Sequence, residues 1–406
     1  MPESRKHIVI VTTWFPPLKG VAVNRMSAFV KYLNASTFKI SVITLQENDA
    51  AIAKTLNGAT IYRLNNNSVL SVFKEEPGEP KFLHYLKVAW NVLLSKLKPL
   101  EFLKWKGLAV KELIRLHSSE PIDLIISSYS PAETHLAAIE FCKKFPSVKW
   151  IADMRDEMSK NPHANGRQKT FLKNIESSIN KHASAVTSVS EPILADFRIL
   201  MPSIKHFEEI RNGFDHSLPP QNNFNDLFTI SYAGTFYGAR KPTTFFQGLH
   251  NFIIKTNATI KLQFIGTNKN FEVPGDCKKY YEFTPFVTNQ KAIEMIAASD
   301  ANLLVLPHVD GKGVYTGKIF DYISVMKPII AVVDPTDVAA KLILEHNAGF
   351  VADFDNIGQI ETAITSAYNL WKEKKSLNMD MKKIAMLHRK YQAAKLETLI
   401  DKLLAE

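Results

Sequence analysis

Residues 7–45 read HIVIVTTWFPPLKGVAVNRMSAFVKYLNASTFKISVITL, and this stretch decides the fold class. Two short apolar runs, 7–13 and 39–45, flank the segment VAVNRMSAFVKYL, whose apolar residues recur with a helical period. Short apolar runs bounded by turn residues predict strands, and the order strand, helix, strand is typical of a parallel sheet. The stretch therefore predicts an α/β fold.

The same alternation continues to the end of the chain. Further strands are predicted at 121–127, 148–153, 183–190, 227–234, 260–266, 301–307 and 327–333. The segment RNGFDHSLPPQNNFND, residues 211–226, is rich in Asn and Pro, has no periodicity and predicts a linker. Because 406 residues exceed what one core normally organises, we predict two Rossmann-like, doubly wound domains, 1–215 and 216–380. The closing segment, 381–406, is predicted to be helical and amphipathic.

Cysteine usage and the first residues limit the cellular setting. Cys142 and Cys277 lie far apart without a CxxC spacing, which argues against a disulfide framework and against a zinc site. The start MPESRKHIVIV lacks the apolar region and cleavage site of a signal peptide, and no apolar run is long enough to span a membrane. We therefore expect a cytoplasmic protein.

The positive charge is concentrated in the first half. The net charge is +10, and residues 1–211 contain 29 Lys or Arg against 20 Asp or Glu. Segment 81–117 interleaves lysines with aromatic residues, which predicts contact with an anionic membrane surface, on the inner face of the cytoplasmic membrane. The alternative is a pair of core helices with a solvated basic face. No nucleic-acid-binding signature accompanies the charge, so nucleic acid is not an expected partner.

In open α/β sheets, ligands bind beyond the carboxyl ends of the strands. After the first strand, Gly20 permits close approach to a helix start, either by a ligand or by packed chain. His135 follows the strand at 121–127, as a catalytic acid or base or as a packed core residue. Asp153, Arg155 and Asp156 cluster after the next strand, as a catalytic site or as a structural ion-pair group.

The second half contains a candidate phosphate site. Its first strand leads into SYAGTFYGARKP, with Gly234 followed by Arg240 and Lys241 before a helix. Glycines let the backbone approach a phosphate, and the cations and the helix start favour negative charge. In GKIFDY, Lys318 and Asp321 lie one turn apart, suited to a diphosphate and a ribose respectively. The alternative is an exposed ion pair.

Five stretches in this order carry a family resemblance: WFPPLKGVAVNRM, WIADMRDEM, IRNGFD, SYAGTFYGARKP and TGKIFDYISVMKPIIAV. The chain resembles GT-B glycosyltransferases, most closely the retaining family 4 enzymes of bacterial surface polysaccharide synthesis. The resemblance implies two Rossmann-like domains facing across a cleft. It also implies that the closing helix, 381–406, packs back on the N-terminal domain; the alternative is a contact with another subunit. It also implies a nucleotide-sugar donor on the C-terminal domain and an acceptor on the N-terminal domain.

The resemblance also implies roles for individual residues. Arg240 and Lys318 correspond to diphosphate ligands, Asp321 to a ribose ligand and Gly20 to the glycine turn near the donor phosphates. The segment containing Asp153, Arg155 and Asp156 corresponds to the acceptor side. One departure concerns the paired acidic motif, because Gly313 occupies the position of its first acid. Enzymes of this kind need no bound metal or cofactor, since cations stabilise the leaving group.

We therefore expect a hexosyltransferase, retaining by resemblance, that transfers a sugar from a nucleotide-sugar, UDP-linked, to a glycan or lipid-linked acceptor in polysaccharide biosynthesis. Asp153, Asp156 and His135 are the catalytic candidates. Two other functions remain open at this stage: a non-catalytic sugar-nucleotide-binding scaffold and a GT-B sugar-nucleotide epimerase. Turnover by the purified protein would separate the enzyme from the scaffold.

Overall fold

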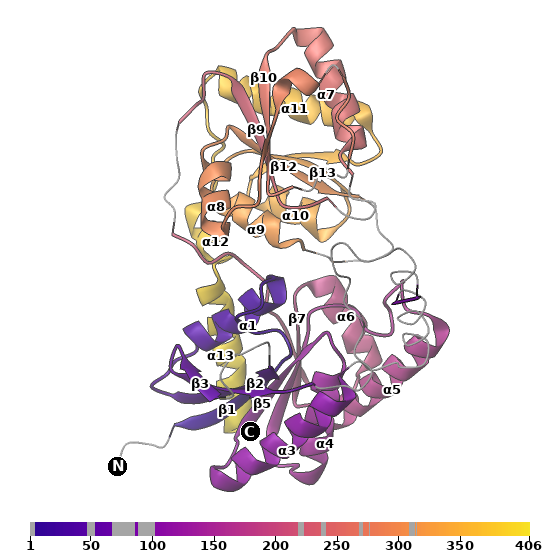
Figure 1. Cartoon of the computed structure of the whole chain (residues 1–406), viewed down its shortest axis with the longest axis vertical. Helices are drawn as coiled ribbons and strands as arrows, with labels where there is room; N and C mark the ends of the chain where they lie inside the picture. Colours follow the sequence, from indigo (N-terminus) through magenta and orange to yellow (C-terminus); the bar gives the residue numbers. More distant parts are fainter. Residues whose placement is uncertain are drawn as a thin grey trace. The chain divides into compact units, whose positions relative to one another are not determined.

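The computed structural model describes residues 5–46, 53–66, 86–87, 102–217, 223–236, 241–267, 271–275, 277–307, 313 and 315–406. The chain forms two compact units (Figure 1). Unit 1 comprises Met1–Ile210 together with Ala393–Glu406, and unit 2 comprises Arg211–Gln392. The sequence had placed the divisions after 215 and after 380.

Unit 1 is built on an eight-stranded sheet. Its strands, in spatial order, are β3 (Ala53–Leu56), β4 (Ala59–Leu64), β2 (Phe38–Leu45), β1 (Lys6–Val11), β5 (Leu124–Tyr129), β6 (Lys149–Met154), β7 (Ala185–Ser188) and β8 (His206–Glu209). Only the β3–β4 pair is antiparallel. Its helices are α1 (Val21–Tyr32), α3 (Leu103–Ser119), α4 (Glu133–Lys144), α5 (Gly166–His182), α6 (Glu191–Leu200) and most of α13 (Arg389–Ala405).

Alternation along β1 explains why both faces of this sheet are covered. Val9 and Val11 pack into the core beneath α3 and α4, whereas Ile8 and Ile10 pack with α1 and α13. Successive side chains of a strand point to opposite faces, so a strand that is apolar at every position must be buried on both sides. The continuous apolar run in the sequence therefore requires two helical layers.

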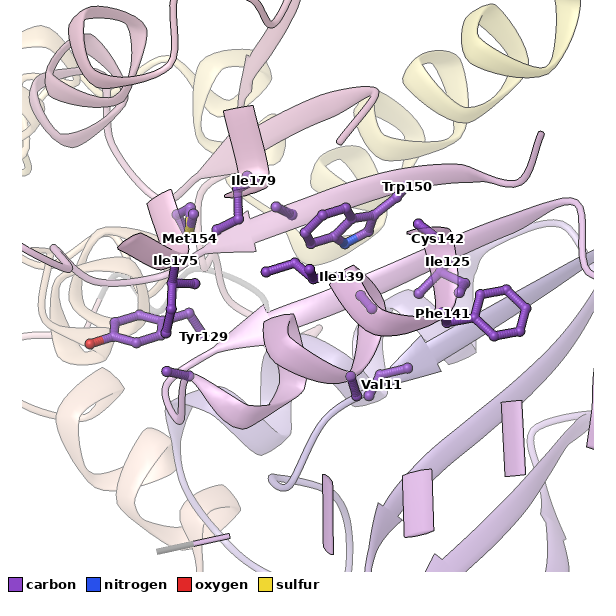
Figure 2. Close-up of a cluster of buried hydrophobic side chains, with 14 of the residues drawn as sticks. Val11, Ile125, Tyr129, Ile139, Phe141, Cys142, Trp150, Met154, Ile175 and Ile179 are labelled. Carbon is purple, nitrogen blue, oxygen red and sulfur yellow. The ribbon is translucent and has the colours of Figure 1, made fainter. Parts of the chain in front are cut away.

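The larger core of unit 1 contains several buried aromatic residues. Figure 2 shows Trp150 of β6 and Phe141 of α4 within this cluster, with the Tyr129 ring at one end of it. The Trp150 side chain is 0% exposed, and its indole nitrogen donates to Ser127 Oγ at 2.7 Å. The indole therefore buries its apolar ring without leaving its N–H unpaired.

Unit 2 contains a six-stranded sheet in which every pair is parallel. In spatial order the strands are β11 (Tyr281–Thr284), β10 (Ile260–Ile265), β9 (Phe228–Ala233), β12 (Ala301–Leu306), β13 (Ile329–Val333) and β14 (Gly349–Asp353). Its helices are α7 (Thr243–Thr256), η1 (Lys278–Tyr280), α8 (Asn289–Ala297), α9 (Gly317–Ser324), α10 (Val338–Glu345), α11 (Ile357–Lys372) and α12 (Met381–Ala385).

Each face of this second sheet has its own core. One core joins β9 and β10 to α7 and α11, and it is rich in phenylalanine. The other joins β12 and β13 to α8, α9 and α10. The strand order β11-β10-β9-β12-β13-β14 changes direction between β9 and β12. A crevice outside the strand ends is expected at such a switch point, so the loops after β9 and β12 are where a ligand should bind.

All nine strands that the sequence predicted are present, as β1, β2, β5, β6, β7, β9, β10, β12 and β13. The structure adds β3, β4, β8, β11 and β14, which are edge strands or next to an edge. Edge strands are buried on fewer sides, so their sequences carry less of the continuous apolar signal. Of the predicted linker, residues 218–222 lie outside the described residues.

Candidate functional site

In unit 2, the end of β9 and the start of α9 meet around one lysine. Lys318 Nζ donates to the Tyr232 hydroxyl at 2.5 Å and lies 3.9 Å from the centre of the Tyr232 ring. In the next turn of α9, the Tyr322 hydroxyl accepts from the Ala233 amide at 2.9 Å. These contacts fix the Lys318 ammonium at the carboxyl end of β9, beside the switch point of the sheet.

Gly234 makes this approach possible. Its φ is +99°, and a Cβ at this position would lie 2.9 Å from Lys318 Cε and 3.1 Å from its Nζ. An L-residue would thus be strained in the backbone and would push the ammonium away. The sequence predicted both Gly234 and Lys318 as donor ligands, and the structure brings the two residues into contact.

Asp321 is partly buried one turn after Lys318. Burial raises the pKa of its carboxyl to about 7, against the opposing charge of Arg389. Behind it, the Ser324 hydroxyl donates to the Asp321 carbonyl at 2.6 Å and lies 2.7 Å from His216 Nε2. Burial lowers the pKa of His216 to about 4, so this imidazole is neutral at pH 7. Lys318 and Asp321 are both half-buried, whereas the alternative interpretation was an exposed ion pair between them.

Other predicted donor residues are only partly described. Lys241 is exposed just before α7. Arg240 lies outside the described residues, so its predicted role stays a prediction. Gly313 has a φ of +77°, and its amide donates to Asp337 Oδ1 at 3.0 Å. Glycine adopts this positive φ without strain, whereas an acidic residue at position 313 would be strained.

Sequence reasoning missed an aromatic residue in unit 2. Phe286 follows β11 and is 84% exposed, and a Cβ at Gly266, just after β10, would lie 4.0 Å from its ring. The loops after β11, β10 and β9 therefore bring Phe286, Gly266 and Gly234 along one edge of the sheet. An exposed aromatic face can stack on a planar base. A lone phenylalanine at the end of a polar edge strand gives no such signal in the sequence.

In unit 1, Gly20 lies immediately before α1. Its φ is +143° and ψ is 172°, and a Cβ there would meet no atom within 4 Å. Glycine is thus required by the backbone and not by a neighbouring side chain. The space beside Gly20 is open, and no side chain caps the start of α1. An anion could approach the amide groups at this helix start only if both conditions hold.

Asp153 is completely buried at the end of β6. Its Oδ1 accepts from Arg25 Nη2 at 2.7 Å and from Thr187 Oγ1 at 2.8 Å, and its Oδ2 accepts from Arg25 Nε at 3.2 Å and from Ser128 Oγ at 2.9 Å. Although burial alone would raise the pKa of Asp153, the ion pair with Arg25 holds it below the ordinary value. A carboxylate with four donors favours the structural alternative over a catalytic base.

His135 is also completely buried. Its Nδ1 lies 2.7 Å from Ser127 Oγ, and its Nε2 lies 3.2 Å from Met154 Sδ. Burial lowers the pKa of His135 to about 3, so the ring is neutral. A side chain with no exposed surface does not reach a substrate, and this geometry favours the packed-core alternative over the catalytic one.

Arg155 and Asp156 follow β6 at the surface side of this buried pair. Arg155 Nε donates to Ser128 Oγ at 3.0 Å, and its Nη2 donates to the Ser130 carbonyl at 2.8 Å. Asp156 is exposed. Of the three catalytic candidates, Asp156 is therefore the one whose carboxyl a substrate can contact.

The basic segment 81–117 is described mainly through α3. Trp105 is completely buried and its indole nitrogen donates to the Thr44 carbonyl at 3.2 Å, whereas Lys104 and Lys111 are exposed. Helix α3 is thus a core helix with a basic outer face, which was the alternative to membrane contact. Residues 81–85 and 88–101 lie outside the described residues, and membrane contact through them stays a prediction.

Two negative findings apply to the described part of the chain. There, no group of three or more His, Cys, Asp or Glu side chains is arranged to hold a metal ion. Within the same residues, no helix combines the length and the apolar character needed to cross a bilayer.

Comparison with solved structures defines the fold. A sucrose-phosphate synthase from Thermosynechococcus elongatus superposes with a TM-score of 0.66 at 12% identity, covering 99% of this chain and 100% of the other. An E. coli trehalose-6-phosphate structure bound with UDP-2-fluoro glucose gives 0.59 at 12% identity, covering 98% and 96%. The α,α-trehalose 6-phosphate synthase from Burkholderia multivorans gives 0.60 at 11% identity, covering 99% of both chains. The chain has the GT-B fold.

This result confirms the fold class that the sequence predicted. The similarity covers both GT-B units, since nearly the whole length of each chain is matched. No protein-family model matches the chain. No curated protein matches it either. At 11–12% identity the shared property is the fold, so the activity has to be argued from the residues of this chain.

Proposed function

We propose that this protein is a glycosyltransferase that transfers a hexosyl group from a UDP-sugar to a glycan or lipid-linked acceptor in cell-surface polysaccharide biosynthesis. The observation that carries the proposal is the contact of Lys318 with Gly234 and Tyr232 at the switch point of unit 2. A cation held at a glycine turn, beside a helix start, is suited to a diphosphate.

Three features support a nucleoside diphosphate over a simple phosphate. Asp321, one turn after Lys318, provides a carboxyl group for ribose hydroxyls. Phe286, exposed at the end of β11, provides an aromatic face for a base. A structure with the same fold has UDP-2-fluoro glucose bound, which favours uridine as the nucleoside.

The proposed mechanism assigns the cations to the leaving group. As the bond between the sugar and the diphosphate breaks, negative charge develops on the diphosphate. Lys318, with Lys241 just before α7 and with Arg240 as the sequence predicts, would stabilise that charge where it develops. These cations would do so without a resident metal ion or cofactor. The role of Gly20 beside the donor phosphates derives from the family resemblance alone.

On the acceptor side, we assign Asp156 the task of orienting or deprotonating the acceptor hydroxyl. Asp153 and His135 instead become positioning residues, because both are completely buried. Retention of configuration and a peripheral location at the membrane are part of the proposal, and both derive from the family resemblance and the basic segment.

Calorimetric titration with UDP, GDP and ADP tests the proposal. We expect UDP to bind most tightly. Lys318→Ala should weaken this binding about tenfold or more, because a charge-assisted hydrogen bond contributes about 1.5–3 kcal/mol. Lys255→Ala is the matched control: Lys255 is an exposed lysine of the same unit whose ammonium pairs with Glu361.

Two results would contradict the proposal. A folded wild-type protein that binds none of the three nucleotides would favour the scaffold for another ligand. Equal weakening by Lys318→Ala and Lys255→Ala would show that net charge, and not the Lys318 site, governs binding. Radiolabelled-sugar transfer from UDP-glucose to a membrane extract then separates an enzyme from a sugar-nucleotide-binding scaffold.

A further inference from the structure

The loop after β1 exposes an indole that none of the roles above uses. Trp14 is 40% exposed, although its neighbour Phe15 is only 1% exposed. Tryptophan is mostly buried in soluble proteins, so an exposed indole at the ligand-binding edge of a sheet calls for an explanation. This edge is the one that also carries Ser130 and Arg155, since β1 pairs with β5 and β5 pairs with β6.

The Trp14 ring is held in place. Its Nε1 donates to the Ser130 carbonyl at 2.9 Å, and Arg155 Nη2 donates to the same oxygen at 2.8 Å. The Trp14 amide donates to Thr12 Oγ1 at 3.1 Å. Further along the loop, Arg63 Nη2 donates to the Pro16 carbonyl at 2.7 Å. Three hydrogen bonds therefore fix the loop and the indole, the fourth fixes the carbonyl that accepts from the indole, and the ring needs little ordering when a ligand binds.

The indole shares a hydrogen-bond acceptor with a charged side chain. Arg155 reaches the same carbonyl as the indole, and the exposed Asp156 follows it in sequence. One face of a pyranose ring presents C–H groups, which pack on an aromatic ring, and its edge presents hydroxyls, which need donors and acceptors. An anchored indole that shares an acceptor with the Arg155 guanidinium, which the exposed Asp156 follows in sequence, fits this pattern.

We propose that Trp14 is the platform on which a pyranose ring of the acceptor stacks, with Arg155 and Asp156 binding its hydroxyls. The inference rests on the proposed function and deepens it, because it makes the acceptor-side ligand a sugar ring and not only a lipid phosphate. It assigns the acceptor a contact residue that the family resemblance did not supply.

Saturation-transfer NMR on the full chain tests this inference. The probes are the methyl glycosides of glucose, galactose, mannose and N-acetylglucosamine. We expect saturation on the C–H protons of at least one probe. Trp14→Ala should reduce it several-fold, and Trp14→Phe should retain most of it because an aromatic face remains. Ile199→Ala is the control for an exposed apolar residue elsewhere in unit 1, since Ile199 is 76% exposed.

Titration of the same samples with UDP separates the Trp14 platform from the proposed function. UDP binding that Trp14→Ala leaves unchanged, together with loss of sugar saturation, is the expected result. UDP binding without saturation of any probe, or with equal saturation in wild type and Trp14→Ala, would overturn the Trp14 platform and leave the proposed function standing. Sugar saturation that depends on Trp14, in a protein that binds no nucleotide, would overturn the proposed function and leave the Trp14 platform standing.

Discussion

At the scale of single residues, burial decides which candidates are available for chemistry. Asp153 and His135 have the right side chains for acid–base catalysis, yet both are completely buried. Asp153 is neutralised by Arg25, and this pair also fixes Ser128, which in turn contacts Arg155. The buried ion pair therefore positions the surface residues of the same edge. Removing one partner would leave an uncompensated charge.

We predict that Asp321 makes the proposed nucleotide affinity depend on pH. Its pKa is about 7 because burial disfavours the charged form. If ribose hydroxyls donate to this carboxyl, the ionised form binds better, so UDP affinity should rise as the pH rises from 6 to 8. Calorimetry at pH 6, 7 and 8 checks this. Because the UDP phosphate also titrates in this range, the comparison with Asp321→Asn isolates the contribution of the carboxyl.

The same pKa has the opposite effect on stability. Folded protein keeps a proton on Asp321 that unfolded protein loses near pH 4, so the free energy of unfolding should fall as the pH rises from about 4 to about 7. The loss is on the order of 1–4 kcal/mol, and Asp321→Asn should show a flatter curve. Parallel curves for wild type and Asp321→Asn, in both affinity and stability, would contradict this assignment.

At the scale of elements, we predict that one added methyl group at Gly234 disrupts the packing of the end of β9 against α9. Gly234→Ala would place a Cβ 2.9 Å from Lys318 Cε at a φ of +99°. We expect a loss of about 1–2 kcal/mol of stability from the backbone strain, and UDP binding weakened as strongly as in Lys318→Ala, because the ammonium is displaced. Calorimetry and urea unfolding measure the two effects.

Gly275→Ala is the matched control in the same unit. A Cβ at Gly275 would meet no atom within 4 Å, and its φ is not in the left-handed region. We expect unchanged UDP binding and equal or slightly higher stability. If both glycine variants bind UDP like wild type, the contact between Gly234 and Lys318 has no role in holding the nucleotide.

Sequence periodicity predicted the central strands and missed the peripheral ones for a physical reason. Strand β8, HFEE, is half-buried at every position and so carries no apolar run. The β3–β4 hairpin did have a local signal, Asn57-Gly58, whose φ values are 50° and 81° and which suits a two-residue turn. The sequence also predicted which polar residues lie at strand ends, such as Asp153. It could not predict that Asp153 is buried, because the burial depends on partners such as Arg25 that lie far away in the sequence.

At the scale of the whole molecule, the chain passes between the units twice, after Ile210 and after Gln392. Within unit 2 these two segments are joined by the bridge between Phe214 and His388. Gly213 allows this close pairing, because a Cβ there would lie 2.3 Å from the Leu387 carbonyl oxygen. Helix α13 then packs in a core of unit 1, so this core is built from two segments that unit 2 separates in the sequence.

This organisation predicts that the last helix controls the stability of unit 1 alone. Ile400 of α13 is 0% exposed and packs in the core with Ile8 and Ile10 of β1. Ile400→Ala should lower the stability of unit 1 by about 2–4 kcal/mol through lost burial and the cavity that remains. Hydrogen exchange should therefore accelerate in peptides from β1, with little change in β12 of unit 2. The exposed Lys402→Ala is the control on the same helix. Equal acceleration in β1 and β12 would mean that the two units unfold together, and no acceleration in either would mean that α13 adds little to the core.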